Sequence, residues 1–167
     1  MRVKRSFVPP DFEIPEGIET ESFRLRMLSV RDVEIDYEAV MSSVEHLQQT
    51  YSVLTGSEWP AGLTLEEDLI DLGWHQREFT LRSSFAYTVV TLDSRCLGCV
   101  YIDPTQKHDH DAEVRLWVRV SELDSGLDAE LFEVVGRWIA KEWPFANPAF
   151  PLREIPLVEW ESLPEDA

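Results

Sequence analysis

Three apolar segments rich in β-branched and aromatic residues follow one another in the second half of the chain, with polar connections between them. Segments of this length and composition are typical of strands joined by hairpins. The predicted strands are residues 85–92, 96–102 and 113–120. A helical pattern follows at about 126–143, with Leu131, Val135 and Trp138 along its apolar stripe. These elements predict an antiparallel meander with a helix packed on it.

The first half of the chain predicts one more strand and two helices. Residues 22–28 alternate apolar and basic side chains, as a half-buried strand does. Apolar residues at helical spacing predict a helix over 30–51, and a capping box of Thr64 and Glu67 opens a second helix. A last short strand is predicted within 153–160. The element order indicates an α+β fold with a mostly antiparallel central sheet flanked by helices.

One domain accounts for most of the chain, because 167 residues suit a single core of moderate size. We expect this domain at 21–160 and a loose tail at 161–167. Residues 1–20 are expected to be extended, since their prolines forbid a continuous helix. The N-terminus lacks the apolar stretch of a secretory signal, and no apolar run approaches the roughly 18 residues that span a bilayer. These features predict a cytoplasmic protein.

Acidic residues are in large excess, and the net charge is −17, from 15 Lys and Arg against 32 Asp and Glu. This charge argues against nucleic acid, whose phosphates attract Lys and Arg, and against anionic membrane surfaces. It favours a cationic ligand or a basic partner through long-range attraction. Solubility alone explains the same charge.

Two stretches, "IETESFRLRML" at 18–28 and "AEVRLWVRV" at 112–120, resemble the corresponding parts of the GNAT acyltransferase superfamily. The order of the elements over about 18–143 is similar to that superfamily as well. The resemblance implies an enzyme that moves an acetyl group from acetyl-coenzyme A (acetyl-CoA) to an amine, carried by a small molecule or a peptide. The acidic composition suits a cationic amine.

The resemblance also implies where acyl-coenzyme A would bind. In the superfamily the fourth strand splays from the fifth, and the pantetheine arm pairs with the fourth strand. A glycine-rich turn at a helix N-terminus then holds the pyrophosphate. The corresponding parts here are 113–120 and 121–127. The residues implied to bind the cofactor are Val118, Arg119, Val120, Ser125, Gly126 and Leu127.

The turn departs from the superfamily's pattern. Leu123 stands where a basic or amide residue is usual, and Asp124 and Asp128 flank Gly126. A carboxylate about 6 Å from a phosphate, at an effective dielectric of about 20, costs roughly 3 kcal/mol before solvent screening. An ordinary helix start explains the same residues, with Asp124 or Ser125 as the cap and Asp128 near the positive end of the helix dipole.

Catalytic roles are implied for Glu113, Tyr87 and Tyr101. Glu113 opens the fourth strand, where the superfamily often places a general base that takes a proton from the attacking amine. The tyrosines lie on the neighbouring strands, and either could protonate the leaving thiolate. A solvated strand end also explains Glu113, and core packing also explains the tyrosines.

The spacing of two cysteines and two histidines resembles that of zinc ligands; these residues are Cys96, Cys99, His108 and His110. Residues three apart on a strand point to opposite faces, so the sequence predicts two separate, reduced thiols. The run "HDHD" at 108–111 offers alternating ligands, but a polar hairpin loop explains it as well. We therefore expect no metal site.

Two functions stay open from the sequence. The first is an acetyltransferase. The second is a catalytically inactive GNAT-like module that binds a partner or forms oligomers such as a homodimer, which the unusual turn chemistry favours. A metal-binding regulatory domain is a third and weaker hypothesis, since it depends on the run at 108–111 alone.

Overall fold

The fold is built around one central sheet. The computed structural model describes residues 6–167. The strands are β1 (Gly17–Glu19), β2 (Arg24–Met27), β3 (Phe85–Val90), β4 (Cys96–Asp103), β5 (Ala112–Val118) and β6 (Pro148–Ala149). Within those residues they form one sheet in sequence order. Neighbours pair antiparallel as far as β5, and β6 lies parallel to β5. The predicted α+β fold with a mostly antiparallel sheet is confirmed.

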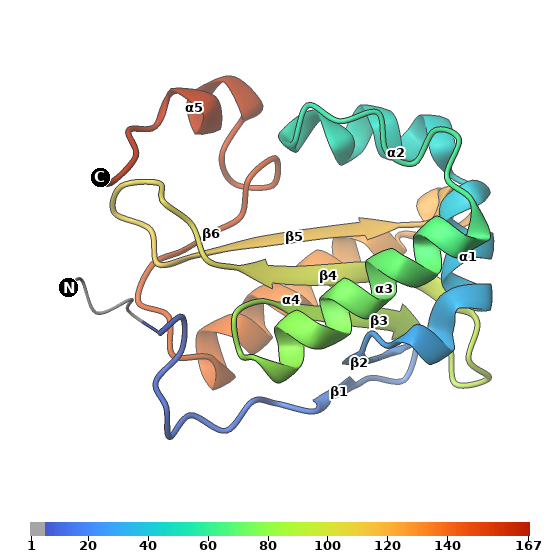
Figure 1. Cartoon of the computed structure of the whole chain (residues 1–167), viewed down its shortest axis with the longest axis horizontal. Helices are drawn as coiled ribbons and strands as arrows, with labels where there is room; N and C mark the ends of the chain where they lie inside the picture. The colour runs from blue at the N-terminus through green and yellow to red at the C-terminus, as the bar shows by residue number, and fades with distance from the viewer. Residues whose placement is uncertain (1–5) are drawn as a thin grey trace.

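Helices cover both faces of this sheet. They are α1 (Val33–Met41), α2 (Val44–Thr50), α3 (Leu65–Thr80), α4 (Leu127–Glu142) and α5 (Leu157–Ser162), with short 3-10 turns η1 (Val30–Asp32), η2 (Ser52–Leu54) and η3 (Val120–Ser125). α1 and α3 lie on one face, α4 lies on the other, and α2 and α5 lie beyond the β5 edge (Figure 1). Among the described residues, none of these helices combines the length and apolar character needed to cross a bilayer.

Two hydrophobic cores hold the helices to the sheet. On one face α4 buries its predicted stripe, and Leu131, Val135 and Trp138 are all buried against the sheet. Full burial of one such side chain contributes about 1.5–3 kcal/mol. On the other face α1 packs on β4 and α3 packs on β3, and α2 contributes Leu47 to the same core. That core includes Val40, Leu47, Cys99, Tyr101 and Trp117.

The helix predicted over 30–51 is broken at Ser42 and Ser43, where α1 ends and α2 begins. The Ser43 hydroxyl accepts the backbone N–H of Val120 at 2.9 Å, and the Ser42 hydroxyl accepts from Arg119 at 3.3 Å. Serine side chains offer hydrogen bonds that compete with the helix ladder. The break therefore ties both helices to the end of β5.

The C-terminal region also differs from the prediction. β6 lies in a stretch expected to be a loop, and the strand predicted within 153–160 is wrong, because a turn and α5 take its place. Pro156 explains the change, since its φ of −58° suits the residue before a helix and its missing N–H weakens a strand. The tail expected to be loose is bound, because the Asp166 amide donates to the Gln106 carbonyl at 2.8 Å.

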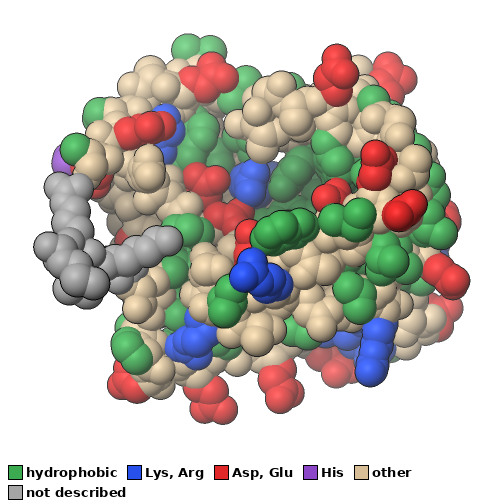
Figure 2. Space-filling view, in the orientation of Figure 1, with side chains coloured by type: hydrophobic (Ala, Val, Ile, Leu, Met, Phe, Trp, Pro, Cys, Tyr) green, Lys and Arg blue, Asp and Glu red, His purple; other side chains and the backbone are tan. Residues whose placement is uncertain are grey.

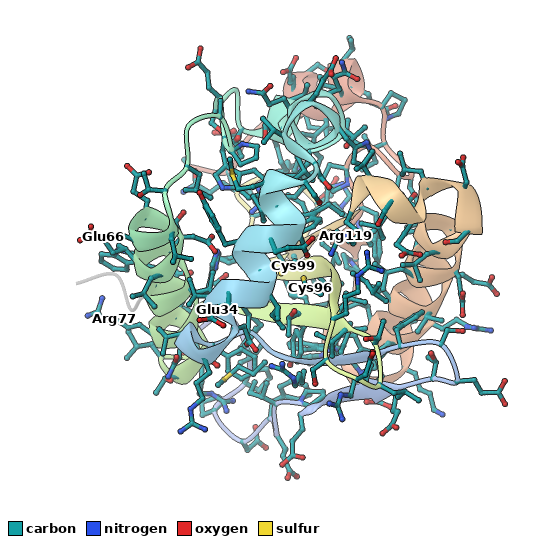
Figure 3. The ribbon with its side chains drawn as sticks, turned by 90° about the vertical axis from the view of Figure 1, so that its right-hand side faces the viewer. Glu34, Glu66, Arg77, Cys96, Cys99 and Arg119 are labelled. Atoms are coloured by element: carbon teal, nitrogen blue, oxygen red, sulfur yellow. The ribbon has the colours of Figure 1, made fainter. Side chains whose placement is uncertain are left out.

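The prediction that Cys96 and Cys99 face opposite sides of β4 is wrong. The register between β3 and β4 pairs Val89 with Gly98 but the next β3 residue with Cys96, so Leu97 is an extra, bulged residue. Both cysteines consequently lie in the core beneath α1 (Figure 3). Both are buried, and within residues 6–167 neither forms a disulfide. Burial raises the pKa of both thiols.

Candidate functional site

A cleft opens where β5 and β6 diverge. The strands pair at Ala112–Pro148 and Glu113–Ala149, and within the described chain no later residue of β5 pairs with β6. The second half of β5 therefore borders a cavity of about 400 Å³, with α2 and the segment after β6 also contributing walls. Its lining includes His46, Leu116, Trp117, Val118, Asp128 and Arg153. We refer to it as the β5 cleft.

An ion pair lies in the β5 cleft. Arg153, from the segment after β6, donates two hydrogen bonds to Asp128 in the first turn of α4, one of them at 2.9 Å. The same guanidinium donates to the Leu116 backbone carbonyl on β5 at 3.3 Å. The charge of Arg153 therefore balances Asp128, which the sequence alone presents as an isolated carboxylate.

The connection from β5 to α4 is the 3-10 turn η3 rather than a glycine-rich loop. It ends at Gly126, whose φ of 78° lies in the left-handed region that favours glycine. The Ser125 hydroxyl accepts the Leu127 N–H at 3.3 Å, and the Val120 N–H is bound to Ser43. Some of the amides that the resemblance offers to a pyrophosphate are therefore satisfied inside the protein.

Arg119, another of the residues implied to bind the cofactor, is bound to α1. Its guanidinium donates to both carboxylate oxygens of Glu38 at 2.6 Å and to the Cys96 carbonyl at 3.1 Å. The residue is 3% exposed, and it lies beneath α1 near the two cysteines (Figure 3). These contacts hold α1 on the end of the sheet.

A second cavity, of about 280 Å³, is lined by α1, α3 and the sheet, and we call it the acidic cavity. Figure 2 shows a hollow between α2 and α3 where acidic, basic and hydrophobic side chains gather. The helices contribute Asp36, Asp68 and Asp71, and β5 contributes Arg115. The aromatic part of the lining is Tyr51, Trp59, His75 and Tyr101.

The carboxyl groups of the acidic cavity are perturbed by their surroundings. Asp36 and Asp68 are 5% and 2% exposed. Burial raises the pKa of Asp36 well above its ordinary value, and the neighbouring Asp68 adds to the shift. Burial also raises the pKa of Asp68 to about 6, and it raises the pKa of Asp71. Perturbed carboxyl groups in a cavity are typical of functional sites.

Arg115 supplies positive charge on the sheet side of the acidic cavity. It pairs with Asp103 at 2.6 Å, and Glu113 lies 3.7 Å from its Nε. Its guanidinium lies 5.6 Å from the ring centre of Tyr51 and 5.9 Å from that of Tyr101. The charge of Arg115 is therefore already balanced by carboxylates of the sheet.

Trp117 separates the two cavities. It lines the β5 cleft, and its indole N–H donates to the Tyr101 hydroxyl at 3.2 Å on the acidic-cavity side. Trp59 packs on it with ring centres 6.4 Å apart. The β5 cleft and the acidic cavity are therefore neighbours on either side of one side chain.

The residues with implied catalytic roles lie in three different places. Tyr101 lines the acidic cavity. Glu113 borders a separate hollow with Lys107, and burial raises its pKa. Tyr87 lies in the core on the α4 face, where its hydroxyl donates to the Pro15 carbonyl at 2.6 Å.

The histidine run is engaged with other parts of the chain. His108 contacts Asp166 at 2.6 Å, and His110 contacts the Asn147 carbonyl at 3.2 Å. In the described part of the chain, no group of three or more His, Cys, Asp or Glu side chains is arranged to hold a metal ion.

Sequence reasoning missed Asp36, Asp68 and Arg153. A signal for the two aspartates existed, because Asp36 lies four residues before Val40 and Asp68 four before Leu72, so each carboxyl falls within an apolar stripe. Such a position predicts a buried charge. Arg153 gave no comparable signal, since the apolar residues of its segment follow neither a helical nor a strand spacing.

Comparisons with known proteins give structural matches and no sequence match. No protein-family model matches the chain, and no curated protein matches it. The ribosomal-protein-S5-alanine acetyltransferase of Vibrio fischeri superposes with a TM-score of 0.60 at 16% identity, over 75% of this chain and 67% of that one. RimL, a ribosomal alpha-N-protein acetyltransferase in complex with coenzyme A, gives 0.58 at 16%, over 74% and 67%. The microcin C7 self-immunity acetyltransferase MccE, with acetyl-CoA and AMP, gives 0.52 at 13%, over 75% and 67%. At these identities the likeness shows a shared fold.

Proposed function

Since the chain has the fold of the GNAT acetyltransferases, we propose that it is an N-acyltransferase that moves an acetyl group from acetyl-CoA to an amine. The observation that carries the proposal is the divergence of β5 from β6, which leaves a cavity of about 400 Å³ along the β5 backbone. The structures of RimL with coenzyme A and of MccE with acetyl-CoA support this choice of donor.

The donor would lie in the β5 cleft. The backbone of Leu116 and Val118 is the proposed partner of the pantetheine arm. The start of α4 at Gly126 and Leu127 is the proposed pyrophosphate site, because the first amides of a helix lack intrahelical partners. The Leu127 N–H would exchange its bond to the Ser125 hydroxyl for one to the phosphate. Arg153 provides a cation near that position, where the superfamily's basic residue is replaced by a leucine.

In the proposed reaction the amine nitrogen attacks the thioester carbonyl carbon. The carbon–sulfur bond breaks, coenzyme A leaves as a thiolate that takes up a proton, and the nitrogen loses a proton. Tyr101 is the proposed proton donor, because it contacts Trp117 between the two cavities and burial raises its pKa. Glu113 is the proposed proton acceptor, since it lies on the same face of β5 as Arg115 and Trp117.

A non-catalytic binding module is the second candidate, and one observation favours it. Arg153 donates to the Leu116 carbonyl, a backbone group that a pantetheine arm would use. If the ion pair with Asp128 keeps this contact closed, the fold would be retained without donor binding.

Two measurements separate these functions. A ligand at 100 times its dissociation constant stabilises the native state by about 2.7 kcal/mol, so acetyl-CoA at sub-millimolar concentration should raise the melting temperature. Thiol release in the presence of a panel of amines then reports transfer. Tyr101→Phe and Glu113→Gln should keep the thermal shift and slow thiol release. Absence of any shift with acetyl-CoA would favour the binding module.

A further inference from the structure

The outer side of α3 exposes an apolar patch. Its large apolar side chains, with one from the neighbouring turn η1, are between 38% and 61% exposed. They are Val30, Leu69, Ile70, Trp74 and Leu81. At roughly 200 Å² for a fully exposed side chain of this size, they present on the order of 500 Å². This area is near the upper end of the apolar patches that monomers expose, so it indicates a protein partner. We call this surface the α3 face.

The patch is continuous because its residues recur at helical spacing. Ile70, Trp74 and Leu81 follow one another at intervals of four and seven residues, so they share one side of the helix. Figure 2 shows hydrophobic side chains gathered over α3. Figure 3 shows Glu66 and Arg77 on the side of α3 that is turned away from the sheet. The α3 face therefore combines apolar and charged side chains on one surface.

Two opposite charges flank the apolar centre of the α3 face. Glu66 lies in the first turn of α3 and Arg77 in its last turn. Within residues 6–167 neither takes part in an ion pair. Arg77 instead lies over the ring of Trp74, 5.5 Å from its centre. A partner that fits this surface would supply a cation at one end, a carboxylate at the other, and apolar side chains between them.

A second copy of this chain supplies both charges. Two identical helices can pack antiparallel about a twofold axis, and the same surface then serves both copies. If the axis passes between positions 71 and 72, Glu66 of each copy faces Arg77 of the other, because these residues are equally far from that point. The α3 face is therefore self-complementary in charge.

The apolar residues fit in the same register. Leu69 of one copy lies opposite Trp74 of the other, and Ile70 lies opposite Gly73. Gly73 has no side chain, and a groove of about 420 Å³ between α3 and η1 lies over it. The groove gives room for Ile70 of the second copy, as a knob packs into a hole between two helices.

The net charge of −17 opposes self-association, but this register keeps like charges apart. The other glutamates of α3 do not face acidic residues, since Glu67 lies opposite Gln76 and Glu78 lies opposite Leu65. At about 0.15 M salt the Debye length is about 8 Å, so charges elsewhere on the two surfaces are largely screened. The repulsion is therefore weak at physiological ionic strength.

We propose that the α3 face is the interface of a homodimer, in which two α3 helices pack antiparallel with reciprocal ion pairs between Glu66 and Arg77. Its apolar area is smaller than the roughly 800 Å² that each partner buries in a standard interface, so we expect a dissociation constant of about 1–100 µM. The β5 cleft is lined by none of the residues of the α3 face. The inference consequently does not rest on the proposed acetyl transfer.

Analytical ultracentrifugation of the full chain measures the assembly. The concentration should run from about 1 to about 500 µM in about 0.15 M salt. We expect the mass to rise from that of one chain, 19.3 kDa, toward twice that value. A native chain that stays monomeric throughout would overturn the proposal and would indicate a different protein as the occupant of the α3 face.

A matched pair of variants locates the interface. Trp74→Gln should weaken the dimer at least about tenfold, because it removes the large aromatic side chain at the centre of the contact. Leu92→Gln should change the affinity less than about twofold. Leu92 is 58% exposed and Trp74 is 56% exposed, but Leu92 lies in the β3–β4 turn, outside the α3 face. Equal losses in the two variants would show general apolar attraction and reject the interface.

An exchange of charges tests the antiparallel arrangement. Arg77→Glu sets glutamates against each other and should weaken the dimer at least about fivefold. The double variant of Glu66→Arg with Arg77→Glu places opposite charges across the interface again, so its affinity should return to within about twofold of the native value. Circular dichroism melting checks that each variant is folded. Failure of the double variant to restore the dimer would reject this arrangement.

Discussion

The ion pair between Arg153 and Asp128 leads to a prediction about the affinity for acetyl-CoA. Removing the charge of Arg153 and removing the charge of Asp128 should change this affinity in opposite directions. Arg153→Met leaves Asp128 unpaired at the start of α4, next to the proposed pyrophosphate position. Asp128→Asn leaves Arg153 as an uncompensated cation in the same cleft. The first change should weaken acetyl-CoA binding, and the second should strengthen it.

The size of the effect follows from the charges. One unit charge about 6 Å from a phosphate charge, at an effective dielectric of about 20, is worth roughly 3 kcal/mol. Solvent and salt at this partly exposed site leave roughly a third, or about 1 kcal/mol, which is about fivefold in affinity. In the native protein the two charges nearly cancel. The double variant of Arg153→Met with Asp128→Asn should therefore bind acetyl-CoA about as well as the native chain.

Calorimetric titration of acetyl-CoA into the four proteins measures these differences. Glu130→Gln is the control, because it removes one exposed carboxylate from the same helix. If Arg153→Met tightens binding and Asp128→Asn weakens it, Arg153 obstructs the β5 cleft, and the reasoning from charge is refuted. Changes of equal sign in both single variants would refute it as well.

Three further predictions concern the fold. Gly98→Ala should unfold the protein or lower its stability by more than about 3 kcal/mol in urea, because a Cβ would lie 2.0 Å from a β5 carbonyl oxygen. Gly136→Ala should be neutral or stabilising, because its Cβ would meet no atom within 4 Å outside the adjoining turns of α4; similar losses in both variants would contradict the reasoning. Arg119→Met should lose about 2 kcal/mol by the same measurement, since its charged hydrogen bonds to Glu38 disappear, and a loss below about 0.5 kcal/mol would be inconsistent with this role. Burial raises the pKa of Asp68 to about 6, against 3.8 ordinarily, so the folded state binds this proton more tightly than the unfolded state. The stability of the native protein relative to Asp68→Asn should therefore fall by up to about 3 kcal/mol as the pH rises from 4 to 7, and parallel pH profiles of stability for the two proteins would exclude the raised pKa.

The sequence predicted the elements whose patterns are local. The meander and the α4 stripe follow from period-two and helical spacing, and the Thr64–Glu67 box marks the start of α3. The predictions that were wrong concern features that depend on partners far away in the sequence. The break at Ser42–Ser43 is specified by hydrogen bonds to Val120 and Arg119, about 77 residues later.

The candidate site was predicted only in part, for the same reason. The resemblance placed the acyl-coenzyme A site at the second half of β5, and the structure has a cleft there, where β5 and β6 diverge; binding of the donor in it stays a prediction. The balance of charge did not follow, because the pairing of Asp128 with Arg153 joins residues 25 positions apart. The acidic cavity joins α1 to α3, and a sequence pattern that treats each helix alone does not bring Asp36 and Asp68 together.

The bulge at Leu97 has a consequence for how this chain tolerates insertions and deletions. A bulge leaves one residue unpaired with the neighbouring strand, here β3, and increases the local twist of the bulged strand. Here the Leu97 carbonyl accepts the Arg119 backbone N–H at 2.8 Å, and the Cys96 carbonyl accepts the Arg119 side chain. Loss of one residue at this point would restore simple alternation, exchange the sides of the strand's first residues, and remove the acceptors of Arg119. In an alignment such a one-residue gap would look like a change of turn length, but it would mark a different attachment of α1 to the sheet.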